Sequence, residues 1–127
     1  MPSWSEYKAH AKERGSLAFE AYVAVSTPAK APEEVAKVLP DHLAYIGELE
    51  RRGALMFAGP LSDETGERME AMGMLILRAA SLEEARALAE GDPMHKTGAR
   101  TFVLRRWLIN EGSLNVSVGL SSGNVTL

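Results

Sequence analysis

Apolar and polar residues alternate through Leu17–Ser26, and this period of two predicts a first strand with one strongly apolar face. Short apolar segments at Ala54–Gly59, Ala71–Arg78 and Arg100–Asn110 predict three further strands. Pro60 follows the second of these segments directly, and it predicts the end of that strand because proline cannot donate to a sheet.

A helical pattern covers Ala31–Arg52, but Pro40 interrupts it. Proline removes a hydrogen bond inside a helix and is tolerated in the first turn. The sequence therefore predicts a short helical turn over Pro32–Val38 and a main helix over Pro40–Arg52. Four apolar residues at helical spacing in and beside the main helix are expected to face the core: Leu39, Leu43, Ile46 and Leu49.

A second long helix is expected to begin at Ser81, where Glu84 completes a capping box, and to end at Gly91. Asp92 is then placed in the turn after this helix, and Pro93 prevents the helix from continuing.

The order β-α-β-β-α-β predicts a ferredoxin-like α+β fold with an antiparallel sheet. Two helices cover only one face of such a sheet, so the other face favours a homodimer packed sheet to sheet. We expect one domain over residues 1–127, with a core at about 17–111, an N-terminal helix within 1–16 and a C-terminal hairpin over 113–127. Ser3 and Glu6 are spaced to cap the N-terminal helix, and Gly15 is placed to end it.

Composition narrows the classes of function. The 14 basic and 17 acidic residues form no basic block, which argues against nucleic acid or a membrane as a partner. The chain has no cysteine, so disulfides and thiolate catalysis are excluded. The polar start of the chain is unlike a secretory signal, and a cytoplasmic location is expected. No nucleotide-binding glycine fingerprint, P-loop or serine-hydrolase elbow is present, and we expect no cofactor.

His42 and Asp92 are the leading candidates for catalytic residues. A carboxylate beside an imidazole fixes the tautomer of the ring and raises its basicity. The other ring nitrogen can then remove a proton next to a carbonyl or deliver one to a leaving group. The structural alternative is a buried histidine that is hydrogen-bonded to a turn aspartate without any chemistry.

Four further residues are candidates for a ligand-binding wall: Tyr45, Gly59, Pro60 and His95. Each has a plainer alternative, which is packing for Tyr45, a strand-end turn for Gly59 and Pro60, and an exposed loop position for His95. His95 with His42 and Asp92 would also supply a two-histidine, one-carboxylate metal site, although nothing in the sequence requires a metal. Four arginines are candidates to clamp a substrate carboxylate, with most of them expected in solvent: Arg52, Arg100, Arg105 and Arg106.

Three features together resemble the YCII-related (YciI-like) family. They are His42 on the first long helix, the motif Ala58-Gly59-Pro60, and Asp92-Pro93 after the second long helix. The resemblance runs from about Leu17 to Glu111. It implies a dimeric α+β barrel with a His–Asp active site formed by His42 and Asp92, but it implies no substrate.

Two functions follow as hypotheses. The first is a small cofactor-independent isomerase, lyase or hydrolase that acts on a compact organic acid or lactone by proton transfer at His42. The second is a non-catalytic ligand-binding or accessory domain in which His42 and Asp92 are a structural or recognition pair.

Overall fold

The computed structural model describes residues 1–127 apart from the side chain of Glu70. The chain divides into two compact units. One unit comprises Met1–Phe19 with Leu108–Leu127, and the other comprises Glu20–Trp107. Whether the whole chain is a single domain stays a prediction.

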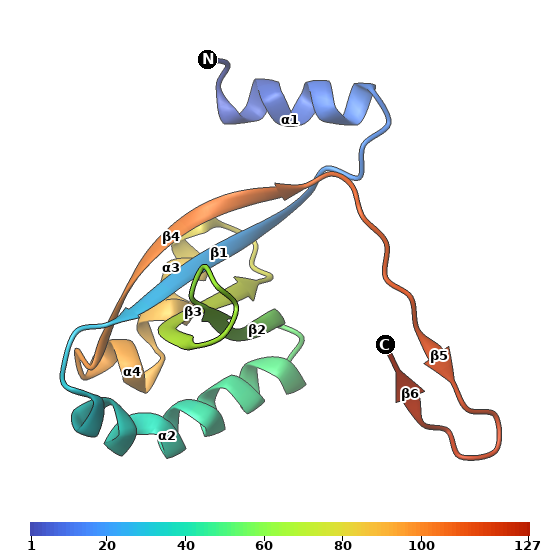
Figure 1. Ribbon diagram of the computed structural model, residues 1–127. Helices are drawn as coiled ribbons and strands as arrows, with labels where there is room; N and C mark the ends of the chain where they lie inside the picture. Colours follow the sequence, from blue (N-terminus) through green and yellow to red (C-terminus); the bar gives the residue numbers. More distant parts are fainter. The chain divides into compact units, whose positions relative to one another are not determined.

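The larger unit contains a four-stranded sheet with the strand order β2-β3-β1-β4 (Figure 1). The strands are β1 (Phe19–Pro28), β2 (Leu55–Ser62), β3 (Met69–Leu77) and β4 (Arg100–Ile109). Strand β3 pairs antiparallel with both β1 and β2. The helices are α2 (Pro32–Arg51), α3 (Leu82–Glu90) and α4 (Pro93–Lys96). This arrangement confirms the predicted ferredoxin-like α+β fold.

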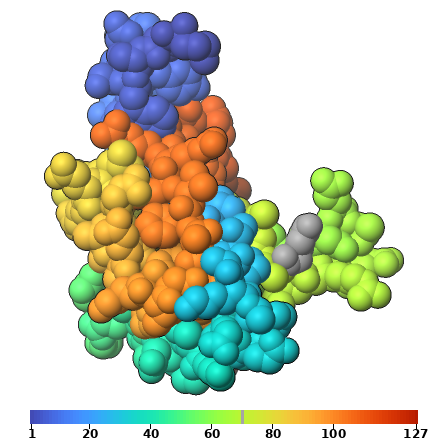
Figure 2. Space-filling model, turned by 90° about the vertical axis from the view of Figure 1, so that its left-hand side faces the viewer, coloured from blue at the N-terminus to red at the C-terminus, as the bar shows by residue number. Residues whose placement is uncertain are grey.

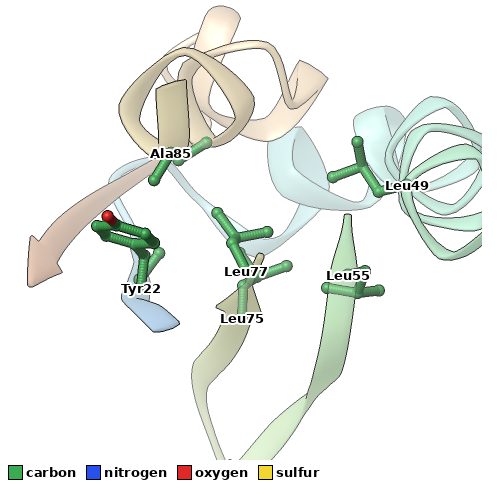
Figure 3. Packing of buried hydrophobic residues seen from close by; sticks show 8 residues of the cluster. Tyr22, Leu49, Leu55, Leu75, Leu77 and Ala85 are labelled. Atoms are coloured by element: carbon green, nitrogen blue, oxygen red, sulfur yellow. The ribbon is translucent and has the colours of Figure 1, made fainter. Parts of the chain in front are cut away.

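The core lies between one face of the sheet and the helices α2 and α3 (Figure 3). Leu49 of α2 and Ala85 of α3 meet side chains that point up from the strands. The strands contribute mainly Tyr22, Leu55, Leu75 and Leu77. Removing this apolar surface from water is the main force that holds the helices on the sheet.

The opposite face of the sheet carries exposed apolar side chains. Phe57 is 53% exposed, Val103 is 59% exposed and Trp107 is 43% exposed. Exposed apolar patches of this kind mark interaction surfaces. The expected homodimer through this face stays a prediction.

Helix α2 is one continuous helix, so the predicted break before Pro40 is wrong. Pro32 occupies the first turn, as proline at a helix start does, and Pro40 lies inside the helix. Proline at this position leaves the carbonyl of Ala36 without its usual donor. Ala36 and Pro40 are both exposed, so water can take the place of that donor.

The predicted core stripe of this helix is also wrong in its first half. Leu49 is 2% exposed and Ile46 packs against the core, but Leu39 and Leu43 are 45% and 57% exposed. The N-terminal half of α2 therefore contributes little to the core, although its residues have the correct helical spacing.

Strand β2 is longer and more exposed than the sequence predicts. It continues through Pro60, which pairs with Gly73, and only Leu55 is buried. Because β2 is an edge strand, Pro60 does not need to donate to a neighbour on its outer side. The turn between β2 and β3 projects as an arm, drawn in lime green at the right of Figure 2.

The smaller unit contains helix α1 (Trp4–Glu13), which has the predicted reciprocal capping box between Ser3 and Glu6. Gly15 follows it with a φ of +86° that favours glycine. Ala11, Ala18 and Leu108 form a small buried cluster. The predicted C-terminal hairpin is present as β5 (Ser117–Val118) and β6 (Val125–Thr126), and its residues are exposed.

Within the part of the chain that the structure describes, no helix is long and apolar enough to cross a membrane.

The unequal burial along α2 leads to a prediction about stability. Leu49→Ala should lower the free energy of unfolding by about 2–5 kcal/mol, because it leaves a cavity in the core. Leu43→Ala is the matched control on the same helix and should change this free energy by no more than about 0.5 kcal/mol. Urea unfolding followed by circular dichroism measures both values, and equal losses would contradict the burial described here.

Candidate active site

Two helices bring His42 and Asp92 together. His42 lies on α2, and Asp92 follows α3 directly and caps the N-terminus of α4. Nδ1 of His42 lies 2.9 Å from Oδ1 and 2.8 Å from Oδ2 of Asp92. The pair expected from the sequence is therefore in direct contact.

The environments of the two side chains differ. The side chain of Asp92 is 2% exposed and that of His42 is 24% exposed. An ionised carboxylate only accepts hydrogen bonds, so Nδ1 of His42 carries the proton that is donated to Asp92. The neutral ring then has its lone pair on Nε2. No described residue forms a hydrogen bond at Nε2, which leaves this nitrogen able to exchange a proton with a bound molecule.

Local sequence explains where the carboxylate is placed. Oδ1 of Asp92 accepts a hydrogen bond of 2.9 Å from the backbone N–H of Met94. Pro93 occupies the first position of α4, where the absence of an N–H is harmless. Asp-Pro is therefore an N-cap followed by a helix start, whereas the sequence prediction treated it only as a stop. This signal was available in the sequence.

Tyr45 connects the two helices beside the pair. Its hydroxyl donates a 2.7 Å hydrogen bond to the carbonyl of Leu88, and the ring lies against Gly91. A Cβ added at Gly91 would lie 2.5 Å from the Tyr45 oxygen, so a larger residue there would displace the ring. Tyr45 thus holds the end of α3, which precedes Asp92, in place against α2.

The pKa of the Tyr45 hydroxyl depends on its burial and on two nearby charges. Burial raises its pKa above the ordinary value of 10.0; the positive charge of Arg52 opposes this rise and the negative charge of Asp92 adds to it. The neutral phenol is thus the form that the folded protein stabilises.

His95 is on α4, three residues after Asp92, but its ring makes other contacts. Nδ1 lies 2.7 Å from the carbonyl oxygen of Ala89, and Nε2 lies 2.9 Å from Oγ of Ser26. The ring also packs on Phe102 with a centroid distance of 4.6 Å. His95 does not join His42 and Asp92 as a third ligand, and the described residues form no group of three side chains suited to a metal ion.

Gly59 and Pro60 lie on the edge strand β2, where they pair with Met74 and Gly73. Their role in a ligand-binding wall stays a prediction.

Ser26 and Arg100 differ from the sequence prediction. Ser26 was not predicted as a site residue. Ser26 is 5% exposed and lies on the helix-covered face of β1 with Tyr22 and Ala24. Arg100 is one of the four arginines predicted as candidate carboxylate clamps, most of which were expected in solvent; it is partly buried, and its guanidinium donates to Ser26. Alternate residues of a strand lie on one face, so Ser26 shares the face of Tyr22 and Ala24. This spacing is the sequence signal for a polar group under the helices.

The fold and the site allow comparison with known proteins. The family model of the YCII-related domain matches residues 18–107 of this chain. The chain belongs to the YCII-related family. A curated relative, the uncharacterized protein YjpA of Bacillus subtilis (strain 168), is 29% identical over 70 residues, which are 55% of this chain and 75% of the relative.

A solved structure has a similar fold. It is 5-chloro-2-hydroxyhydroquinone dehydrochlorinase (TftG) from Burkholderia phenoliruptrix AC1100, in complex with 2,5-dihydroxybenzoquinone. The TM-score is 0.51, the sequence identity is 20%, and the match covers 68% of this chain and 92% of that chain. At this identity the similarity shows a shared fold and nothing further.

The raised pKa of Tyr45 predicts part of the alkaline behaviour of the protein. In the unfolded chain the phenol ionises near pH 10, and in the folded protein it ionises at higher pH. The stabilisation is therefore complete below pH 10 and is lost as the pH rises through the folded pKa. Tyr45→Phe should make the fall in unfolding free energy above about pH 10 shallower. Unfolding curves from pH 8 to 11 measure the slope, and the same slope in both proteins would contradict this assignment.

Proposed function

We propose that this protein is a small cofactor-independent enzyme that uses His42 as a general base and acid, with Asp92 as the orienting group. The observation that supports the proposal is the contact of Nδ1 of His42 with both carboxylate oxygens of Asp92, at 2.9 and 2.8 Å. This contact directs the basic lone pair of the imidazole to Nε2, and the His42 side chain is 24% exposed.

The chemistry available to such a pair is proton transfer. Nε2 removes a proton next to a carbonyl, or from a hydroxyl, and Asp92 stabilises the imidazolium that forms. The same nitrogen then returns the proton to another carbon, which is isomerisation, or the electron pair of the broken C–H bond expels a leaving group, which is elimination. Where the proton comes from water, the hydroxide attacks a lactone carbonyl, the ring C–O bond breaks and the imidazolium gives its proton to the leaving oxygen, which is hydrolysis. The reaction class is therefore isomerase, lyase or hydrolase, and the substrate class is a small organic acid, lactone or ring compound with an acidic proton.

The structural neighbour supports elimination in particular. Its name describes removal of chloride from a chlorinated hydroxyhydroquinone, and it was solved with a dihydroxybenzoquinone. We therefore include halogenated hydroquinones among the candidate substrates, and we propose a homodimer through the exposed sheet face as the working assembly. Tyr45, Gly59 and Pro60 remain the predicted lining of the site, whereas both ring nitrogens of His95 are bonded to Ser26 and Ala89.

Turnover assays test the proposal. Wild-type protein is incubated with lactones, enol acids and 5-chloro-2-hydroxyhydroquinone, and product and released chloride are measured. His42→Gln should lower turnover by about 10²–10⁴-fold, which is the usual contribution of a general base. Asp92→Asn should also lower it, because an amide stabilises the imidazolium less well than a carboxylate.

His10→Gln is the matched control, since His10 is exposed on α1 and the chemical change is the same. Full turnover in His42→Gln would refute the proposal. Binding of these compounds without turnover, unchanged by His42→Gln, would favour the alternative role as a ligand-binding domain.

A further inference from the structure

Ser26 connects two basic side chains from different elements. Its Oγ on β1 lies 2.9 Å from Nε2 of His95 on α4 and 2.9 Å from Nε of Arg100 on β4. Nη2 of Arg100 also bonds the carbonyl oxygens of Ser26 and Ala71, at 2.8 and 2.6 Å. His95 bonds the carbonyl of Ala89 at 2.7 Å through its other nitrogen. One small cluster thus connects α3, α4 and three strands.

The direction of each hydrogen bond follows from the chemistry of the groups. A guanidinium only donates, so Oγ of Ser26 accepts from Arg100. A carbonyl oxygen only accepts, so Nδ1 of His95 carries a proton. The hydroxyl proton of Ser26 is then available to Nε2 of His95, which accepts it as a neutral imidazole. In this arrangement the Ser26 hydroxyl and both ring nitrogens of His95 have hydrogen-bond partners, and neither ring nitrogen is left for a ligand.

The same turn of chain carries His95 and Asp92. The backbone N–H groups of His95 and Lys96 bond the carbonyl of Asp92 at 2.8 and 2.9 Å, and Asp92 caps Met94. Helix α4 has only four residues, and a single turn of helix is not stable alone. Contacts of its side chains with the rest of the protein must therefore hold it, and these are made by Met94, which is 4% exposed, and by His95.

The opposite charges of Arg100 and Asp92 also favour the observed position of the Asp92 carboxylate. Burial lowers the pKa of Arg100, and the negative charge of Asp92 opposes that shift, so the two groups attract each other without direct contact. Arg100 therefore places a positive charge near the Asp92 carboxylate, which is almost completely buried.

We propose that Ser26, Arg100 and His95 form a positioning network for Asp92, which holds the α4 turn so that the carboxylate faces Nδ1 of His42. This inference rests on the proposed function, because proton transfer by His42 needs Asp92 at Nδ1 and a free Nε2. It assigns His95 to the support of the site and not to a ligand-binding wall. None of the three residues is proposed to touch the substrate.

The tautomer of His42 is the property to measure, because a role in overall stability alone would not change it. Long-range proton–nitrogen NMR spectra report which ring nitrogen of His42 carries the proton in the neutral ring. Asp92→Asn gives the reference for a lost carboxylate. Ser26→Ala removes the central hydroxyl, and His95→Phe keeps an aromatic ring against Phe102 while it loses both hydrogen bonds.

Ser26→Ala and His95→Phe should each raise the share of neutral His42 rings that carry the proton on Nε2 instead of Nδ1. The rise should be smaller than the one that Asp92→Asn produces. Ser26→Thr keeps the hydroxyl and should restore the wild-type tautomer. Thr27→Ala is the matched control: it removes the neighbouring hydroxyl contact between β1 and β4, at 3.4 Å, without touching α4. Thermal unfolding of each protein reports its overall stability separately.

A folded Ser26→Ala protein with the wild-type His42 tautomer would overturn the inference, and so would an equal change in Thr27→Ala. If His95→Phe does not fold, the comparison of Ser26→Ala with Ser26→Thr decides alone. The spectra need no substrate. A failure of the network is therefore distinct from a failure of the proposed function, which appears as full turnover in His42→Gln.

Discussion

Asp92 carries a carboxylate at a position where 1% of the residue reaches solvent. A buried charge is tolerated only when hydrogen bonds or opposite charges replace the water that it loses. Here the replacements are the N–H of His42, the backbone N–H of Met94 and the nearby charge of Arg100. The hydrogen bonds that stabilise the buried carboxylate also orient the imidazole of His42, so one constraint serves both the fold and the proposed chemistry.

Contacts between the helices and the sheet hold Asp92 and the groups around its carboxylate in place. Tyr45 fixes the end of α3 against α2, and His95 with Ser26 fixes α4 against the sheet. The core beneath these contacts is apolar and is supplied mainly by the C-terminal half of α2, by α3 and by the strands. The part of α2 from Pro32 to Leu43 contributes His42 but no buried apolar group, and Leu39 and Leu43 stay exposed beside it.

Local patterns predicted the order of the elements, and the predicted turn positions together with the family resemblance singled out the His42–Asp92 pair. The presence of β1, the capping box of α1, the Ser81 N-cap and the glycine at the end of α3 depend on near neighbours in the chain, and they were predicted correctly. The predicted capping box at Ser81 is only half formed, because the Glu84 side chain accepts from the N–H of Ala80 and not from that of Ser81. The Asp92-Pro93 step also contained its own helix start, but a proline after a helix was taken only as a stop.

Other features depend on partners that are distant in sequence. Pro60 lies within a strand because β2 is at the sheet edge, and a one-dimensional pattern does not say which strand is at the edge. Arg100 is drawn inward by Ser26, 74 residues away. Leu43 is exposed although it has the helical spacing of a core residue, and this spacing carries no information about what packs against each part of the helix.

The central claim is that His42 and Asp92 interact directly and with a measurable energy. A double-mutant cycle tests it, with unfolding free energies of the wild type, His42→Ala, Asp92→Ser and the double variant. Serine at position 92 keeps an N-cap for α4, so the cycle isolates the contact between the two side chains. We expect a coupling energy of roughly 0.5–3 kcal/mol, as for residues in contact. Effects that add to within about 0.3 kcal/mol would show that the pair does not interact, and would contradict the account.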